Sequence, residues 1–321
     1  MAQKVLWVRK GTEGTGGFGE GGFPAVHQPS DVRFRRVAAE IDTRIDRLPP
    51  FPTVLTELIA LTQRDDSDAD ELRSCVEKDP VIAARLLKLA NSAFYSPRSS
   101  VTSIQQSVVM LGRQTVRSLA MAAATLKFLS GGFEAYGMGG GGLWLHSYGT
   151  AELARRFARL AGGEEDLQES VYVGGLLHDI GKIVLSGILT DAVAHGDSSL
   201  RGRRDENVRD WEKRVAGVTH AAVGEMIAEK WKLAPATVRC VRCHHSCDGG
   251  EEHYEKEVQL VTLADAGARR LGMGLGEADE NPDREERAMG VLGISGSGFA
   301  EVLNEYEERS ADAGDLFSLL G

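Results

Sequence analysis

Apolar residues recur at the three- and four-residue spacing of amphipathic helices from Leu48 onward. The pair Asp79-Pro80 indicates a helix start, because an N-cap acceptor precedes a proline whose missing N–H costs nothing in the first turn. The run that follows, VIAARLLKLANSAF, is apolar on more than one face and is expected in a core. Gly112 separates the next two apolar runs, IQQSVVML and RQTVRSLAMAAATLKFL. Residues 43–130 are therefore predicted to form an all-helical module.

A glycine-rich tract divides the helical pattern. Seven glycines fall within residues 131–142, so this tract is predicted to be a linker, more mobile than the helices on either side. Helical spacing resumes at Leu143, and residues 143–271 are predicted to form a second helical module. Residues 1–42 are poor in apolar side chains and are expected to be a flexible extension. Residues 272–321 combine a charged, solvated spacer, EADENPDREER, with a stretch able to form a helix or two. The predicted fold class is all-α.

Composition narrows the partners and the compartment. A chain of 321 residues is long enough for two domains and for a hydrophobic core that needs no disulfide or structural metal to be stable. Its net charge of −10 argues against a nucleic-acid partner, since binding a phosphate backbone requires a basic face. The first ten residues lack the apolar segment of a signal peptide, and no stretch approaches about 18 apolar residues. Four cysteines do not make a secreted disulfide framework. We expect a cytoplasmic protein without membrane association.

Five of the eight histidines fall in one ordered series with two aspartates, each where a helix is the expected local structure. Neutral imidazoles and carboxylates supply ligands suited to Fe, Mn, Zn or Mg. Facing helices of a bundle bring such residues together even when they are distant in sequence. The alternative is a relic site, in which the same side chains form a polar, hydrogen-bonded core. The candidate metal ligands are His146, His178, Asp179, His220, His244, His245 and Asp265.

The cysteines allow other interpretations. Cys240, Cys243 and His244 spell C-x-x-C-H, the attachment motif of c-type haem, but nothing in the sequence indicates the export that this attachment needs. A zinc or iron–sulfur site would have only three clustered thiols, because Cys247 follows closely and Cys75 lies in the other module. We favour a third interpretation, a stripe of small buried residues on one helix.

Several phrases resemble one family. LPPFPTVLTELIAL, VEKDPVIAARLLKLANSAFYS and VTSIQQSVVMLGRQTVRSLA resemble the amino-terminal half of the HDOD family. WLHS, GLLHDIGKIVL, THAAVGEMIAEKW and RCHH resemble its second half, so the resemblance covers roughly residues 43–271. It implies an all-α fold and a role as an output or scaffold module in bacterial signal transduction. A signalling partner would bind through residues 43–130, for instance at Arg113 or Arg117 if these face outward.

The resemblance also implies a metal site. The related HD-GYP phosphodiesterases cleave cyclic di-GMP with two or three metal ions, and their ligand order is the one found here. Matched by position, one ion would be held by His146, His178, Asp179 and Asp265. A second ion would be held by Asp179, His220, His244 and His245, with Asp179 bridging. Two ions about 3.5–4 Å apart can clamp a phosphodiester and activate a bridging water.

Other positions near this series bear on the chemistry. Lys182, in HDIGK, is expected either to face a phosphate oxygen as a point charge or to help close a helix C-terminus. The chain continues IVLSGILTD, without the Gly-Tyr-Pro signature, which argues against hydrolysis of cyclic di-GMP. Gly142 stands four residues before His146, where three-metal HD-GYP enzymes place a glutamate, so a third ion has no acidic anchor.

Two functions follow as hypotheses. The first is a regulatory HDOD protein that contacts a partner or senses a ligand, such as a nucleotide or phosphorylated small molecule, and carries one or two divalent ions. The second is an active metal-dependent phosphohydrolase acting on a nucleotide or cyclic dinucleotide. Asp179 and Lys182 would then be its catalytic residues.

Overall fold

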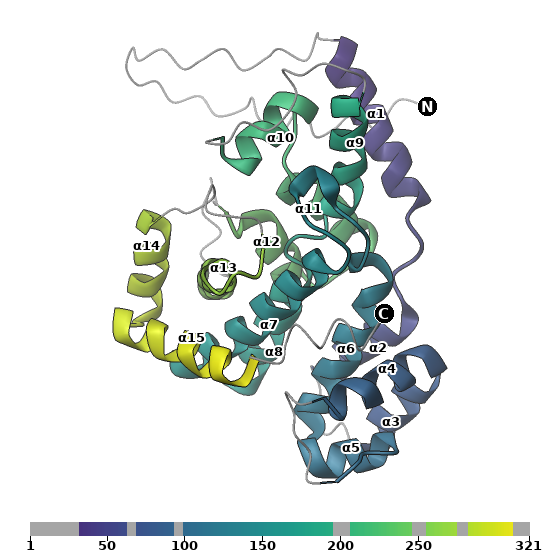
Figure 1. Cartoon of the computed structure of the whole chain (residues 1–321), viewed down its shortest axis with the longest axis vertical. Coiled ribbons are helices and arrows are strands. Elements are labelled where there is room, and N and C mark those ends of the chain that lie inside the picture. The colour runs from purple at the N-terminus through teal and green to yellow at the C-terminus, as the bar shows by residue number, and fades with distance from the viewer. Residues whose placement is uncertain are drawn as a thin grey trace.

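The computed structural model describes residues 32–62, 69–92, 99–194, 206–245, 255–274 and 282–310. These residues form helices joined by short connections and contain no strand, which confirms the all-α class (Figure 1). The helices of the first part are α1 (Val32–Arg47), α2 (Thr53–Thr62), α3 (Ala69–Glu77), α4 (Pro80–Ala90), α5 (Ile104–Leu111) and α6 (Arg113–Leu129). The 3₁₀ turn η1 (Glu134–Tyr136) follows, and then come α7 (Gly142–Leu160), α8 (Glu165–Leu177), α9 (Lys182–Ala194), α10 (Val208–Ala216), α11 (His220–Lys230), α12 (Pro235–Cys243), α13 (Glu255–Arg270), α14 (Pro282–Leu292) and α15 (Gly296–Ser310).

Helix boundaries in the first part agree with the local signals. The Asp79 side chain accepts hydrogen bonds from the backbone N–H groups of Val81 and Ile82, with Pro80 in the first turn of α4. Gly112 adopts a φ of +84° between α5 and α6, a conformation that residues with a side chain rarely take. The N-terminal ends of α4 and α6 are therefore set by the residues that the sequence indicated.

Helix α1 begins at Val32, inside the segment that we expected to be a flexible extension. Phe34, Val37, Ile41 and Ile45 follow one another at helical spacing, and Ile41 and Ile45 are buried. This stripe packs against α9, α10 and α11, and Figure 1 shows α1 beside α9. The prediction for residues 32–42 was wrong because their apolar partners lie more than a hundred residues later in the chain. Residues 1–31 lie outside the described structure.

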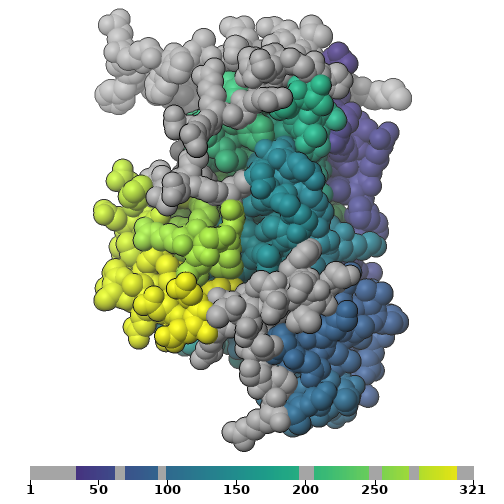
Figure 2. Space-filling view, viewed as in Figure 1, coloured from purple at the N-terminus to yellow at the C-terminus, as the bar shows by residue number. Residues whose placement is uncertain are grey.

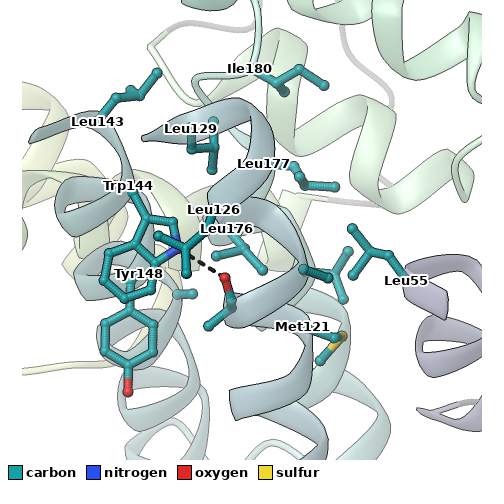
Figure 3. Packing of buried hydrophobic residues seen from close by; sticks show 14 of the residues in the cluster. Leu55, Met121, Leu126, Leu129, Leu143, Trp144, Tyr148, Leu176, Leu177 and Ile180 are labelled. Carbon is teal, nitrogen blue, oxygen red and sulfur yellow. Dashed lines mark hydrogen bonds between the residues drawn. The ribbon is translucent and has the colours of Figure 1, made fainter. Parts of the chain in front are cut away.

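The hydrophobic core does not divide at the glycine-rich tract. One continuous cluster of buried side chains runs from Ile41 to Val241 and includes residues of α2, α4, α6, α7, α8 and α9. Figure 3 shows part of it, with Leu126 and Leu129 of α6 close to Trp144 of α7. The Trp144 indole N–H donates to the carbonyl of Ala122, 2.9 Å away. The structure therefore does not confirm two separately packed modules.

The tract itself is packed as a tight turn. Phe133 and Met138 exchange two backbone hydrogen bonds, and the 3₁₀ turn Glu134–Tyr136 lies between them. Phe133, Tyr136 and Met138 are all buried. The high glycine content concealed these three large side chains, which anchor the turn in the core. Its greater mobility stays a prediction.

Arg117, considered above as a surface contact, is buried. Its guanidinium lies 3.1 Å from Glu169 of α8 and donates to the carbonyl of Leu61 at 3.2 Å. Gln114 donates to the other oxygen of Glu169, and Arg155 of α7 lies 3.5 Å from that oxygen. Arg117 therefore joins α6 to α8 and does not face outward as the partner hypothesis required.

The C-terminal helices cover one flank of α7 and α13. A second cluster of buried side chains joins Leu153 and Phe157 of α7 to Phe299 and Tyr306 of α15. Figure 2 shows α14 and α15, in lime to yellow, on one flank of the molecule. Part of the segment predicted as a solvated spacer is therefore the helix α14, in which Glu285 is buried.

One described stretch, Glu165–Ala194, is long and apolar enough to cross a membrane by length and composition alone. It covers α8 and α9, and 83% of its most apolar window is buried inside the molecule. Packing in the core accounts for its apolar character.

Candidate metal centre

The turn between α8 and α9 carries His178 and Asp179 and lies directly against the start of α11. A Cβ atom added to Gly181 would lie 1.9 Å from the carbonyl oxygen of His220 and 2.6 Å from the backbone nitrogen of Gly224. Only a residue without a side chain allows this approach of backbone to backbone. The glycine of HDIGK therefore places His220 beside Asp179.

Close helix packing brings the other residues to the same point. A Cβ atom on Gly175 of α8 would lie 2.9 Å from Cα of Ala151 in α7, so α7 and α8 approach closely enough for His146 to face His178. Asp265 projects from α13, which packs against both α7 and α8. The two remaining histidines follow the last turn of α12. All seven candidate ligands are 6% exposed or less.

On one side of Asp179, two histidines face its Oδ2 atom, and Asp265 contacts these histidines. Nε2 of His146 lies 3.5 Å from this oxygen, 3.2 Å from Nε2 of His178 and 3.2 Å from Oδ1 of Asp265. Nε2 of His178 lies 3.3 Å from Oδ2 of Asp179 and 3.8 Å from Oδ1 of Asp265. We call His146, His178 and Asp265 the Oδ2 side. Neither His146 nor Asp265 points away from the His178-Asp179 pair.

The other three histidines lie toward Oδ1 of Asp179. Nε2 of His220 is 3.2 Å from this oxygen, and Nε2 of His244 is 3.7 Å from it. Nε2 of His220 also lies 3.0 Å from Nε2 of His245 and 3.4 Å from Nε2 of His244. We call His220, His244 and His245 the Oδ1 side. Each oxygen of Asp179 thus faces its own group of imidazoles.

Hydrogen bonds at the Nδ1 atoms fix which nitrogen of each ring faces the centre. Nδ1 of His146 lies 2.7 Å from the carbonyl of Met273, and Nδ1 of His178 lies 2.7 Å from that of Gly175. Nδ1 of His244 lies 2.9 Å from the carbonyl of Val241. A carbonyl only accepts, so these Nδ1 atoms carry the hydrogen and the Nε2 lone pairs of the neutral rings point inward. This is the tautomer that binds a metal through Nε2.

His220 and His245 are supported by side chains instead. Nδ1 of His220 lies 2.8 and 2.9 Å from the two oxygens of Glu212, which fixes the same tautomer. His245 differs, because Nη1 of Arg284 lies 3.1 Å from its Nδ1. A guanidinium only donates, so this contact favours the opposite tautomer, with the hydrogen on Nε2. His245 is thus the one candidate ligand in the described structure whose support opposes metal binding.

The convergence of acceptor atoms fits a metal ion. Oδ1 of Asp179 is buried and accepts no hydrogen bond within the described part of the chain, although the lone pairs of His220 and His244 face it. Ligand atoms about 2.1 Å from one ion lie about 3.0–3.4 Å from each other in tetrahedral or octahedral geometry. The separations quoted within each group, 3.0–3.8 Å, therefore approach those of a ligand shell. Ligand atoms within 4.8 Å of one another form two groups, one of Asp179, His220, His244 and His245 and one of His146, His178 and Asp179, and Asp265 belongs to neither.

Neighbouring charges keep both aspartates ionised. Burial would raise the pKa of Asp179, but the charges of His178 and Lys182 outweigh it and hold this pKa well below its usual range. Burial has the same effect on Asp265, where Arg269 and His146 hold the pKa well below its usual range. Burial lowers the pKa of His244 to about 4, which keeps that imidazole neutral and able to bind a metal.

His178 differs from His146, His244 and His245, whose pKa values are lowered by burial. Burial acts to lower its pKa, but the adjacent charge of Asp179 outweighs burial and raises it. A proton therefore competes with a metal for His178.

Lys182 begins α9, and its ammonium donates to Oδ2 of Asp179 at 2.5 Å. This position at the start of α9 does not fit a lysine that closes a helix C-terminus, and the role toward a phosphate stays a prediction. On α13, Arg269 donates to Oδ2 of Asp265 and leaves Oδ1 toward the histidines. Each aspartate of the centre therefore has one oxygen neutralised by a basic side chain.

Four further residues of this site were not predicted: Tyr136, Glu212, Arg269 and Arg284. Glu212 had a signal in the sequence, because it is an acidic residue on the apolar face of α10, beside the buried Trp211 and Val215. Arg284 had none, since it falls in the segment read as a solvated spacer. Cys240 and Cys243 are buried on α12, where burial raises the pKa of the Cys240 thiol, and Cys247 lies outside the described residues.

An all-α fold with an Asp-centred cluster of histidines contributed by separate helices defines a protein of the HD-related class. The chain matches the HDOD domain over residues 48–247 and belongs to the HDOD family. Asp265, Arg269 and Arg284 lie beyond the matched residues.

Solved structures share the fold. An HDOD domain protein of unknown function from Geobacter sulfurreducens is 24% identical, with a TM-score of 0.68 over 90% of this chain and 97% of that one. A candidate signal transduction protein from Marinobacter aquaeolei is 19% identical, with a TM-score of 0.65 over 90% of this chain and 66% of that one. An uncharacterized protein of Treponema pallidum is 24% identical over 236 residues, 74% of this chain. The chain spans 45% of the length of that curated relative.

Proposed function

We propose that this HDOD protein is a regulatory module that binds one or two divalent metal ions at Asp179. The observation that carries the proposal is the convergence of the Nε2 atoms of His146 and His178 on Oδ2 of Asp179, and of the Nε2 atoms of His220 and His244 on its Oδ1. Lone pairs this close repel one another unless a proton or a metal ion lies between them. Supported neutral imidazoles together with carboxylates suit a divalent ion such as Fe, Mn, Zn or Mg.

The residues divide between two positions. His146, His178 and Asp265 would hold an ion with Oδ2 of Asp179, and His220 and His244 would hold one with Oδ1, joined by His245 if its tautomer changes. Bound ions would supply Lewis acidity toward a phosphoryl group or a bound water. The protein residues supply the rigid arrangement, because the Nδ1 partners of four rings fix their orientation before any ion binds.

Burial and sequence favour regulation over turnover. All seven side chains are almost inaccessible, whereas a phosphodiester must reach both metal positions to be cleaved. The chain also lacks the Gly-Tyr-Pro signature of cyclic di-GMP phosphodiesterases. The same proposal includes contact with a signalling protein through residues 43–130 and a cytoplasmic location. Arg113, which is half-buried at the start of α6, is the arginine to substitute in a test of partner binding.

The test compares Asp179→Ala with the wild type. Asp179→Ala removes the charged ligand shared by both positions and should abolish stoichiometric metal, measured by inductively coupled plasma mass spectrometry after purification without chelator. Asp191→Ala is the matched control, because Asp191 is an exposed aspartate near the end of α9 that pairs with Arg44. Equal metal content in Asp179→Ala and wild type would show that the centre is elsewhere. Metal-free wild-type protein after loading would favour the relic site.

A metal-dependent phosphohydrolase is the second candidate. It is favoured by the arrangement of one aspartate between two groups of ligands, which suits a pair of ions. Under the regulatory proposal, metal-loaded wild type hydrolyses cyclic di-GMP, cyclic GMP-AMP and common nucleotides no faster than Asp179→Ala. Metal-dependent turnover near about 1 s⁻¹, the low end of typical enzymes, and its loss in Asp179→Ala would establish the phosphohydrolase instead.

A further inference from the structure

Glu212 lies outside the candidate ligand set, yet both of its oxygens are directed to the site. It is completely buried on α10. Its Oε1 accepts a hydrogen bond from the Tyr136 hydroxyl at 2.7 Å, and its Oε2 accepts one from the backbone N–H of His220 at 2.9 Å. Nδ1 of His220 lies between the two oxygens, at 2.8 and 2.9 Å. One carboxylate thus receives three donors.

This arrangement acts on the metal position through His220 alone. Nδ1 of the ring must donate to the carboxylate, so the Nε2 lone pair points to Oδ1 of Asp179, 3.2 Å away. The bond from the His220 backbone also fixes the first residue of α11, so the ring and its backbone are held by the same group. A carboxylate on the far nitrogen both selects the tautomer and makes the ligand more basic.

Tyr136 extends the arrangement to the glycine-rich turn. Its buried ring packs edge-on against Trp211, with centroids 5.9 Å apart, and the Lys182 ammonium lies 5.5 Å from its centre. Lys182 in turn contacts Oδ2 of Asp179. The turn at residues 133–138 therefore reaches Oδ1 of Asp179 through Glu212 and His220, and Oδ2 through Lys182.

We propose that Glu212, held in place by Tyr136, is the positioning residue that orients His220 and sets the metal affinity of the Oδ1 side. The inference rests on the proposed metal-binding function and adds a specific determinant to it. Outer partners of this kind change metal affinity by about 10–100-fold.

Two substitutions remove the interactions with little change of volume. In Glu212→Gln, an amide N–H₂ replaces one acceptor and meets Nδ1 of His220 or another of the three donors, so the imidazole hydrogen moves to Nε2 or a donor loses its partner. Tyr136→Phe removes only the hydroxyl that fixes Glu212. The matched controls are Glu169→Gln and Tyr172→Phe, which alter a buried carboxylate and a buried tyrosine hydroxyl in α8, outside the site.

The first measurement needs no metal. Long-range ¹H–¹⁵N spectra of protein labelled at histidine report the tautomer of each ring. We expect His220 to carry its hydrogen on Nδ1 in the wild type and in both controls, and to change in Glu212→Gln. Should Glu212→Gln fail to fold, the same spectra are recorded for Glu212→Asp and Tyr136→Phe. In these variants we expect His220 to show a mixture of the two tautomers.

The second measurement is calorimetric titration of metal-free protein with Zn²⁺. Affinity at the Oδ1 side should fall by about 10–100-fold in Glu212→Gln, and by less in Tyr136→Phe and Glu212→Asp, while affinity at the Oδ2 side changes little. An unchanged tautomer with unchanged Zn²⁺ affinity would overturn the inference and leave the metal centre standing. A wild type that binds no Zn²⁺ would overturn the proposed function and the affinity part of the inference with it. The spectra would then still decide whether Glu212 orients His220.

Discussion

On the Oδ2 side of Asp179, the imidazoles of His146 and His178 are supported by backbone carbonyls, and basic side chains already neutralise the carboxylates. On the Oδ1 side, His220 and His245 depend on the side chains of Glu212 and Arg284, and Oδ1 accepts no hydrogen bond within the described residues. The two sides share Asp179 but differ in which groups hydrogen-bond to their ligand atoms when no metal is bound. Basic groups on the first side contact the carboxylates themselves, whereas on the second side Arg284 contacts His245 and not Asp179 in the described structure.

This difference indicates an order of binding. An ion on the Oδ2 side must displace the Lys182 ammonium from Asp179, and it competes with a proton for His178, whose pKa is raised. An ion on the Oδ1 side displaces no hydrogen bond to Asp179 and meets His244, whose pKa of about 4 leaves it neutral. We therefore expect the first equivalent of metal to bind at the Oδ1 side.

The largest change in metal binding is expected when one histidine is removed from either side. His220→Ala should abolish the first equivalent, and His178→Ala should abolish the second, with affinity losses of at least about 100-fold, since removing a ligand exceeds the effect of an outer partner. Metal content and two-site titration distinguish the variants. Loss of both equivalents in either variant would show that the two sides bind metal only as a unit.

Removing the ammonium should sharpen the contrast. Lys182→Met leaves the buried Asp179 carboxylate without its partner, so the metal-free protein should lose about 3–5 kcal/mol of unfolding free energy. The same change frees Oδ2 and should tighten binding on that side by about 10-fold, or about 1.4 kcal/mol. Urea unfolding with and without metal measures both effects. The prediction fails if Lys182→Met weakens metal binding on the Oδ2 side.

The smallest effect is expected at Arg284. Arg284→Met removes the donor at Nδ1 of His245 and lets that ring adopt the tautomer that binds through Nε2. Affinity on the Oδ1 side should rise by a few-fold, about 1 kcal/mol or less, the scale of a single hydrogen bond. Titration with Zn²⁺ tests this, and a decrease in affinity would mean that Arg284 supports the site. Metal affinity on the Oδ1 side is expected to fall in Glu212→Gln and to rise in Arg284→Met. The two variants therefore distinguish a residue that supports metal binding from one that opposes it.

Much of this arrangement could be predicted from the sequence, and what could not has a common physical cause. Helix caps such as Asp79 act over a few residues, so the local pattern predicts them. The candidate ligands were identified because their residue types and order are characteristic of a family. Glu212 and Tyr136, by contrast, become part of the site only when α10 and the glycine-rich turn pack together, 76 residues apart in sequence.

The charge of a side chain did not indicate whether that side chain is exposed. Arg117 was offered as a partner contact on the condition that it faces outward, but it is buried, and Glu169 of α8 compensates its charge in the interior. The same applies to the basic residues around the centre. Whether a charged side chain is buried depends on an oppositely charged partner, and the partner of Arg117 lies 52 positions further along the chain.

The contact between Gly181 and His220 sets the spacing between Asp179 and the start of α11 in a way that no side chain can adjust. A methyl group there would have to move from 1.9 Å to ordinary contact beyond 3.4 Å, and the opposing backbone has no rotamers with which to yield. The start of α11 would shift as a body and carry His220 away from Asp179. Even the smallest substitution at Gly181, to alanine, therefore requires the backbone to move. The glycine fixes a minimum distance between two segments of chain, and any inherited replacement has to be accompanied by a new geometry for the histidines that depend on it.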